Sequence, residues 1–334
     1  MTRAQLYGRR LAHADPSPSA TTLRRALDLG VSFLRRRQSR NGVWKGFRLP
    51  PGPATTWLTA HVAWVCEEVP ALRDARTRAA LHLRHIGPED GGWGYNRRVG
   101  VDSDSTAQAL LVLGCYPSTV PHFLLETLLR AQLPEGGFAT YSPRAGRVSG
   151  WHAAHPDVTI VAVAALRRYG LHEAEERALE WLAGEGLRSG FASYWWPGTA
   201  YGLWARARVH VRGPGMTTAV TAALAGALPT PQGAQLLAAA LALGLEGEHE
   251  KTTEAAAAQI LGTQLTDGSW PCSPCLRVTD PRETETLPEL PGRVYADERR
   301  IFSTAHAVAA LQAMFDRVGR ARPSDSSSIP VETG

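Results

Sequence analysis

Five short stretches of the chain are almost entirely apolar or small, and a serine or threonine stands at or near the start of each. They lie at 58–63, 105–110, 158–163, 217–222 and 303–308. Serine or threonine before an apolar run is typical of a helix start. A helix that is apolar nearly all round is buried, so these stretches predict buried helices. More polar stretches rich in Arg and Glu alternate with them, for example 171–182, and indicate outer helices.

A second pattern recurs between these stretches: glutamine, three residues, glycine, one residue, aromatic. It occurs at 38–44, 132–138 and 264–270, with degenerate copies at 90–93 and 188–191. The aromatic residues recur about every 50 residues, a period that indicates a repeat architecture. One repeat cannot bury its apolar face alone, so neighbouring repeats must stack.

The two patterns together predict an all-α fold, a single (α/α) toroid of alternating inner and outer helices. The expected starts of the inner helices are Leu58, Ser105, Val158, Thr217 and Ser303. The interval between the aromatic residues at 191 and 270 is too long for one repeat. The stretches at 217–222 and 236–245 therefore suggest an extra hairpin whose aromatic phrase has decayed.

Length and composition narrow the possibilities. The 334 residues suffice for one such toroid, expected at 21–320, between a mobile segment at 1–20 and a disordered tail at 321–334. The net charge of +5 is scattered along the chain, which argues against nucleic acid as a partner. Four cysteines make no disulfide framework, and no stretch suits a membrane span or a secretory signal. A cytoplasmic protein is expected.

One repeat carries an acidic phrase, Asp102-Ser-Asp104-Ser-Thr106, directly at the start of its apolar stretch. When the apolar stretches are aligned, two positions of each repeat fall beside one mouth of the toroid. Four residues stand where the second repeat has Asp104: Trp57, Asp157, Met216 and Phe302. Four others stand where it has Asp102: Thr55, His155, Pro214 and Arg300. The alignment thus predicts that Asp102, Asp104, His155 and Asp157 converge.

These motifs resemble those of a known family. The glutamine–glycine–aromatic phrases are similar to the QW motifs of squalene–hopene cyclases and related class II terpene cyclases. The phrase at 102–106 resembles their Asp-x-Asp-Asp acid motif, in the Asp-x-Asp-Thr-Thr form of drimenyl-diphosphate-type cyclases. The resemblance extends over about residues 25–315, nearly the whole chain.

The resemblance implies protonation of an alkene in a polyprenyl or prenyl diphosphate substrate, which starts carbocation cyclisation. It assigns the proton-donor role to Asp104, while Asp102 would tune this acid and hydrogen-bond its second oxygen. Crowded carboxyl groups keep one of them protonated, because they cannot all ionise in a low-dielectric site. Aromatic faces would surround the cation. The candidate aromatic residues are Trp57, Trp93, Tyr95, Trp195, Trp196, Trp204 and Phe302.

The sequence offers fewer candidates for residues that bind a charged group of the substrate. Arg97 and Arg98 follow the second aromatic phrase and are candidates for binding a diphosphate, although solvated surface charges give the same pattern. No cofactor and no protein-bound metal are expected, and Mg²⁺ enters only as an optional partner of a diphosphate.

Three departures from the family pattern matter. Ser105 stands where the family has its final acidic residue. The family histidine that reaches the acid from the next inner helix is replaced by Val161, which leaves His152 or His155 as substitutes. Most class II cyclases have a second toroid, whereas this chain has room for one. The pocket therefore lies inside the single toroid, or a partner subunit completes it.

Several alternatives stay open. Asp102, Asp104 and Asp157 could be helix caps, and the aromatic residues of the QW-like phrases could be purely structural. Cys272 and Cys275 suggest zinc, as in the β subunits of protein prenyltransferases, which share this toroid. Those subunits have histidine at the start of the last inner helix, where this chain has Ser303. A non-catalytic toroid that binds an isoprenoid or a protein is the remaining alternative.

Overall fold

The computed structural model describes residues 18–116, 120–142, 150–226, 228–245 and 249–320. These residues form twelve α-helices and four short strands. The helices are α1 (Ala20–Arg37), α2 (Thr56–Val65), α3 (Arg73–Asp90), α4 (Ser103–Leu113), α5 (His122–Leu129), α6 (Pro156–Arg168), α7 (His172–Ser189), α8 (Ala200–Arg208), α9 (Met216–Leu224), α10 (Thr230–Ala242), α11 (Glu250–Gly262) and α12 (Ile301–Arg320). The strands are β1 (Gly46–Leu49), β2 (Gly52–Ala54), β3 (Pro274–Thr279) and β4 (Gly292–Ala296).

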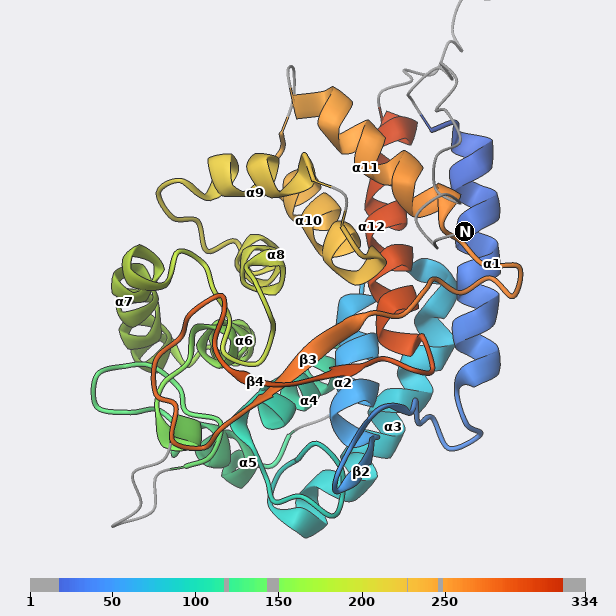
Figure 1. Cartoon of the computed structure of the whole chain (residues 1–334). Helices are drawn as coiled ribbons and strands as arrows, with labels where there is room; N and C mark the ends of the chain where they lie inside the picture. Colours follow the sequence, from blue (N-terminus) through green and yellow to red (C-terminus); the bar gives the residue numbers. More distant parts are fainter. Residues whose placement is uncertain (1–17, 117–119, 143–149, 227, 246–248, 321–334) are drawn as a thin grey trace, which may run out of the picture.

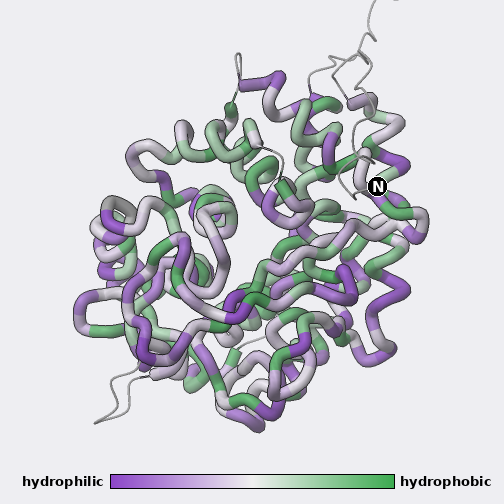
Figure 2. The backbone as a smooth tube through the Cα atoms, viewed as in Figure 1, coloured by the Kyte–Doolittle hydropathy of each residue, from purple (hydrophilic) through white to green (hydrophobic). Residues whose placement is uncertain are grey.

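The even-numbered helices form an inner ring. Helices α2, α4, α6, α8, α10 and α12 contact one another in this order, and α12 returns to α2. The odd-numbered helices pack outside them, for example α7 on α6 and α1 on α12 (Figure 1). Figure 2 shows hydrophobic residues along the inner helices and more hydrophilic ones along the outer helices and loops. The predicted all-α toroid is thereby confirmed.

Four of the five predicted inner helices begin close to the expected residues, in α2, α4, α6 and α12. The prediction for Thr217 is wrong, because this residue lies in the outer helix α9, where Thr217 and Thr218 are exposed. The inner helix of that repeat is α8, which starts earlier, at Ala200. The 236–245 stretch corresponds largely to the inner helix α10, so the predicted extra hairpin is present as α9 and α10.

The QW-like phrases tie each outer helix to the next. The Gln38 amide donates to the carbonyls of Gly42 and Ala75, at 2.9 and 2.8 Å. Gln132 and Gln264 make the same pair of bonds, and Gln264 reaches Ala26 in α1, which closes the ring. A threonine of each following inner helix accepts from the backbone N–H of the aromatic residue: Thr59, Thr106, Thr159 and Thr304.

The glycine of this phrase is required by its backbone. Gly136 has φ +103°, and a Cβ there would lie 2.3 Å from the Arg177 carbonyl of the next outer helix. Gly42 and Gly268 are equivalent, with positive φ and the same close approach to an outer helix. The phrases are therefore structural connectors, which was one of the alternatives left open by the sequence.

Two hairpins, β1–β2 and β3–β4, lie at the end of the toroid where the inner helices begin. Figure 1 shows β3 and β4 running across the ring, from α12 toward α6 and α7. Most of the predicted mobile segment (1–17 of 1–20) and all of the predicted tail (321–334) lie outside the described residues, so the proposed domain limits of 21–320 stay a prediction.

Candidate active site

Asp104 lies in the first turn of α4 and is partly exposed. Its Oδ2 accepts a hydrogen bond of 2.6 Å from Trp57 Nε1 of the neighbouring inner helix α2. Gln108 Nε2, one turn further along α4, lies 3.0 Å from both carboxyl oxygens. Asp104 is not the cap of its helix, so the capping alternative does not explain this side chain.

Asp102 is the N-cap of α4. Its Oδ1 accepts from the Ser105 N–H at 2.6 Å, and its Oδ2 accepts from Ser105 Oγ at 2.8 Å. Both oxygens are thus occupied within the cap, and the second oxygen of Asp104 bonds Gln108 rather than Asp102. Ser105, which replaces the last acidic residue of the family motif, supports the buried Asp102.

Asp157 is buried in the first turn of α6 and accepts from two backbone N–H groups, of Tyr194 at 3.0 Å and Trp195 at 2.9 Å. It therefore holds the loop before α8 rather than capping its own helix. His155 is fully buried, donates from Nε2 to the Gly150 carbonyl at 2.7 Å, and stacks on Tyr194. His152 contacts the Tyr141 carbonyl. Neither histidine has a recorded contact with Asp104.

Burial and neighbouring charge act together on the acid. Desolvation, followed by the negative charge of Asp102, raises the pKa of Asp104 to about 7, with a smaller contribution from Asp157. The hydrogen bonds from Gln108 and Trp57 act in the opposite direction. Burial also raises the pKa of Asp102 to about 6. Near neutral pH, Asp104 is therefore present in both its neutral and its ionised form.

Aromatic rings pack next to this carboxyl group in the centre of the toroid. Trp196 stacks between Tyr201 and Phe302, with ring centroids 4.5 and 5.0 Å away. Trp57 lies 5.8 Å from Trp196, and Trp204 lies deeper, 5.2 Å from Tyr201. All five rings are buried. Of the predicted aromatic residues, Trp57, Trp196, Trp204 and Phe302 therefore form one cluster.

The other predicted substrate-binding residues lie elsewhere. Trp93 is fully buried and donates to the Leu83 carbonyl, so it belongs to the wall between α3 and α4. Tyr95 donates to the Phe47 carbonyl, and Trp195 donates to Thr140 Oγ1. Arg97 and Arg98 are exposed, and Arg97 pairs with Glu89 and Asp90 at 3.5 and 3.6 Å. These two arginines line a separate surface cavity of about 330 Å³.

The sequence-based prediction missed four residues of this interior: Gln108, Tyr201, His61 and His306. Gln108 follows Asp104 by four residues, a spacing that places both on one helix face and could have revealed it. Tyr201 was missed because the fourth inner helix was placed at Thr217. His61 and His306 lie in apolar stretches, where the sequence pattern alone does not distinguish them from ordinary buried core residues.

Arg277 of β3, also missed, seals this end of the toroid. Its buried guanidinium donates to the carbonyls of Ser193, Tyr194, Pro288 and Leu290. Its backbone N–H donates to the Trp195 carbonyl at 2.7 Å. The β3–β4 hairpin is thus fastened to the loop that also bonds Asp157, and the end that carries Asp104 is covered.

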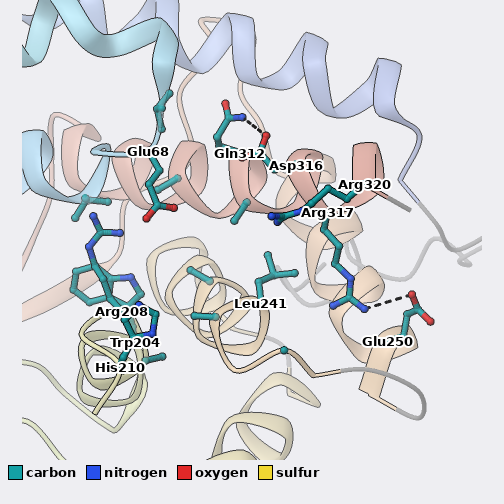
Figure 3. Close-up of a pocket in the computed structure, with 18 residues that line it drawn as sticks. Glu68, Trp204, Arg208, His210, Leu241, Glu250, Gln312, Asp316, Arg317 and Arg320 are labelled. Atoms are coloured by element: carbon teal, nitrogen blue, oxygen red, sulfur yellow. Dashed lines mark hydrogen bonds and ion pairs between the residues drawn. The ribbon is translucent and has the colours of Figure 1, made fainter. Parts of the chain in front are cut away.

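A cavity lies at the opposite end of the inner helices. It has a volume of about 880 Å³ and is lined by residues that include Trp204, Arg208, Leu241, Asp316, Arg317 and Arg320. In Figure 3, Trp204 and Arg208 approach from α8, whereas Asp316 and Arg317 extend from α12. Trp204, a member of the aromatic cluster, also lines this cavity, and its ring lies 4.7 Å from that of His306 between centroids.

No group of three or more His, Cys, Asp or Glu side chains in the described part of the chain is suited to hold a metal ion. Cys272 is exposed and Cys275 is buried, so the zinc alternative has no ligand set among these residues. Within the same described ranges, no helix combines the length and apolarity that crossing a bilayer requires.

Comparison with known structures places the fold. A variant of the type II terpene cyclase MstE from Scytonema, in complex with geranylgeranyl dihydroxybenzoate, superposes with a TM-score of 0.75 at 22% identity. The match covers 89% of this chain and 98% of that one. A protein from Actinoplanes gives a TM-score of 0.73 at 26% identity, over 87% of this chain and 99% of that one.

A third structure, ent-copalyl diphosphate synthase from Streptomyces platensis, gives a TM-score of 0.50 at 20% identity. The match covers 76% of this chain but only 50% of that enzyme. No family model and no curated protein sequence matches the chain. The predicted resemblance to class II terpene cyclases is confirmed by these structures, which share its helical toroid.

Proposed function

We propose that this protein is a class II terpene cyclase-like enzyme that protonates an alkene of a prenyl chain at Asp104. The observation that carries this proposal is the state of that carboxyl group. It lies at the start of an inner helix, under two indole rings, with its pKa raised to about 7 by burial and by Asp102. An acid of this kind is neutral often enough near pH 7 to act as a proton donor.

In the proposed reaction, the Asp104 O–H gives its proton to an alkene carbon, and the π electrons form the new C–H bond. The carbocation is attacked by the next double bond, which closes a ring. Loss of a proton or capture of water ends the reaction. The Asp104 carboxylate that remains accepts hydrogen bonds from Trp57 and Gln108 until solvent returns a proton. The cation lies against the faces of Trp196 and Phe302.

The proposed substrate is a prenyl chain with a polar head group. The interior beside Asp104 suits the hydrocarbon tail, because the buried rings of Trp57, Trp196 and Phe302 present apolar faces there. The head group would occupy the 880 Å³ cavity at the far end, where Arg208, Arg317 and Arg320 suit an anionic group. Phe302 and Ala309 on α12 are separated by about 10 Å at a rise of 1.5 Å per residue, so an extended chain can connect the two regions. Tyr201 and Trp204 must turn aside to admit it.

A single toroid is sufficient in this proposal. Two structures of MstE variants, each covered to 98% by the match to this chain, hold the prenylated substrate or the product merosterolic acid A. This supports an internal pocket within residues 21–320 rather than one completed by a partner subunit. We also propose that the protein is cytoplasmic. Mg²⁺ would bind only together with a diphosphate head group, if the substrate carries one.

The test is turnover by the purified protein alone. Geranylgeranyl dihydroxybenzoate, farnesyl diphosphate and geranylgeranyl diphosphate, the last two with and without Mg²⁺, would be incubated at pH 6 in H₂O and in D₂O. We expect a cyclised product that gains one deuteron on carbon in D₂O, since the initiating proton comes from an exchangeable acid. If the folded protein turns over none of the three but binds one of them, a non-catalytic isoprenoid-binding toroid replaces the proposal.

A further inference from the structure

A chain of buried polar side chains extends from Asp104 into the centre of the toroid. Gln108 Nε2 lies 3.0 Å from both Asp104 oxygens, and Gln108 Oε1 lies 2.9 Å from His61 Nδ1 of α2. His61 Nε2 lies 3.1 Å from His306 Nε2 of α12. Gln108, His61 and His306 are buried, although the surroundings are otherwise aromatic and aliphatic. An unneeded polar group would be costly at this depth, so the chain calls for an explanation.

The donor and acceptor in each of these hydrogen bonds follow from the ionised form of Asp104. An ionised carboxylate only accepts, so the Gln108 NH₂ group faces Asp104 and the Gln108 carbonyl faces His61. His61 Nδ1 must then carry a hydrogen. A neutral imidazole has one N–H, so His61 Nε2 presents a lone pair to the N–H of His306. Gln235 Nε2 lies 3.4 Å from His306 Nε2, where both atoms are donors, so the chain ends at His306.

We propose that Gln108 is the positioning residue of the acid, and that the neutral His61–His306 pair holds its amide in the donating orientation. With this orientation fixed, the amide gives Asp104 no acceptor. The proton of neutral Asp104 therefore cannot be tied up in a bond to Gln108 and stays available to the alkene. If the amide turned over, its carbonyl would accept that proton and the acid would point into the protein. The inference rests on the proposed function.

The charges around this chain keep the histidines neutral. Burial lowers the pKa of His61 to about 3 and that of His306 well below its ordinary value, and Arg208 of α8 acts in the same direction. Asp102 of α4 and Asp157 of α6 raise the pKa of Asp104. Tyr201 of α8 faces the acid as a neutral phenol, since burial and Asp104 raise its pKa well above the ordinary value. The rings of Trp57 and Phe302 both stack against His61, with centroids 4.9 and 5.0 Å away and interplanar angles of 19° and 17°.

His61 takes the place of a histidine that the family has and that this chain lacks. The histidine that the family brings from the next inner helix is Val161 in this chain, and neither His152 nor His155 has a recorded contact with the acid. His61 comes instead from the preceding inner helix, and it acts on Asp104 through Gln108.

The first experiment needs no substrate. Nitrogen-15 NMR of selectively labelled histidine in the intact protein should show His61 as a neutral imidazole with its hydrogen on Nδ1, unchanged between pH 5 and pH 9. Carbon-13 NMR of the aspartate carboxyl groups follows the ionisation of Asp104 in the same sample. A His61 that carries its hydrogen on Nε2, or one that becomes charged in this range, would overturn the inference even if the protein cyclises its substrate.

Variants supply the second experiment. Gln108→Met keeps the unbranched shape and removes the donors. His61→Phe keeps a ring packed against Trp57 and Phe302 but removes the N–H. In both, the pKa of Asp104 should rise by about one pH unit, because a bond to its charged form is lost or reversed. In both, the turnover measured at low pH, where Asp104 is fully neutral, should fall about tenfold or more.

The matched control is Gln259→Met, a glutamine of the outer helix α11 that takes no part in this chain of side chains, and for it both quantities should stay unchanged. A fall in turnover without any movement of the Asp104 pKa in Gln108→Met would show a merely structural role. An unchanged pKa and unchanged turnover would overturn the inference as well. If neither variant folds, the NMR of the unmodified protein decides. Absence of turnover in every sample, with the expected NMR result, would count against the proposed function and not against the network.

Discussion

The two ends of the inner-helix ring differ in almost every physical property. At the end where the helices begin, three carboxyl groups lie close together under a cover of two hairpins, and Arg277 fastens that cover through backbone carbonyls. At the other end lies an open cavity of about 880 Å³, lined by charges of both signs. Acidic residues at the closed end have raised pKa values, whereas Glu67, near the open end, has a lowered pKa because of Arg168 and Arg208.

An enzyme that forms a carbocation has two requirements, and each end of the ring meets one of them. A weakly basic alkene is protonated only by a neutral acid, and a buried, covered end with crowded carboxyls supplies one. A substrate must also enter and a product must leave, which the open end permits. The stacked rings between the ends, among them Trp196 and Phe302, exclude water from the cation.

The largest effect is expected at the acid itself. Asp104→Asn keeps the shape of the side chain and removes the acidic proton, so turnover should fall by about 10²–10⁴-fold or more. Asp102→Asn should cost less, because Asp102 acts on the acid through its charge and its cap. Initial rates of product formation measure both. Cyclisation by Asp104→Asn at the unmodified rate would remove the acid role from this residue.

The pH dependence of turnover tests the role of the closed end without a mutation. The pKa of Asp104 is raised to about 7, so its neutral, donating form predominates below that pH and is lost above it. Turnover should therefore fall about tenfold per pH unit once the pH passes about 7. The same sign applies to the contribution of Asp104 to stability: its carboxyl holds a proton in the folded state between about pH 4 and pH 7, so this contribution decreases as the pH rises, whereas the buried His61 and His306, whose pKa values are lowered, contribute with the opposite sign. A rate that increases with pH would point to a carboxylate base.

The cavity at the open end can be narrowed by a larger side chain at one of the residues that line it. Leu241 lines the cavity, and Leu241→Trp should lower kcat/KM by about tenfold, mainly through KM, since it takes space from the head group. The control is Leu81→Trp on the outer helix α3, where the side chain is 50% exposed. Equal activity of both variants would mean that the substrate does not use this cavity.

The cover of the closed end can be loosened at one residue. Arg277→Met removes the buried hydrogen bonds that attach β3 to the loop before α8, and it should lower the free energy of unfolding by about 2 kcal/mol. The same change should let water reach the cation and increase the share of hydroxylated product. Denaturant unfolding and product analysis measure the two effects. A stable variant with an unchanged product ratio would show that the cover does not exclude water.

The smallest effect is expected on the surface. Arg97→Ala removes an exposed side chain that pairs with Glu89 and Asp90. Stability should change by less than about 0.5 kcal/mol, and kcat/KM should stay the same, since we place the head group at the opposite end of the toroid. A large increase in KM for a diphosphate substrate would instead support Arg97 as its ligand.

Much of the scaffold was predictable because it repeats. The Gln38, Gln132 and Gln264 phrases make the same backbone bonds, so one pattern in the sequence reports one geometry each time. The prediction failed where the pattern decays, and the fourth inner helix was placed at Thr217 instead of Ala200. Without the phrase, apolar residues in a short helix do not reveal whether it is inner or outer.

The sequence by itself determined the toroid and the position of Asp104 at the start of an inner helix, because both follow from local periodicity. Only the tertiary structure decided which side chains meet that acid. Trp57 reaches it from the neighbouring inner helix α2, and His61 of the same helix acts on it through Gln108, while Trp93 and His155 are engaged elsewhere. Such contacts depend on side-chain direction and on the packing of helices far apart in the chain. The difference between the closed and the open end also arises only in the tertiary structure, because a hairpin near the C-terminus covers helices that begin near the N-terminus.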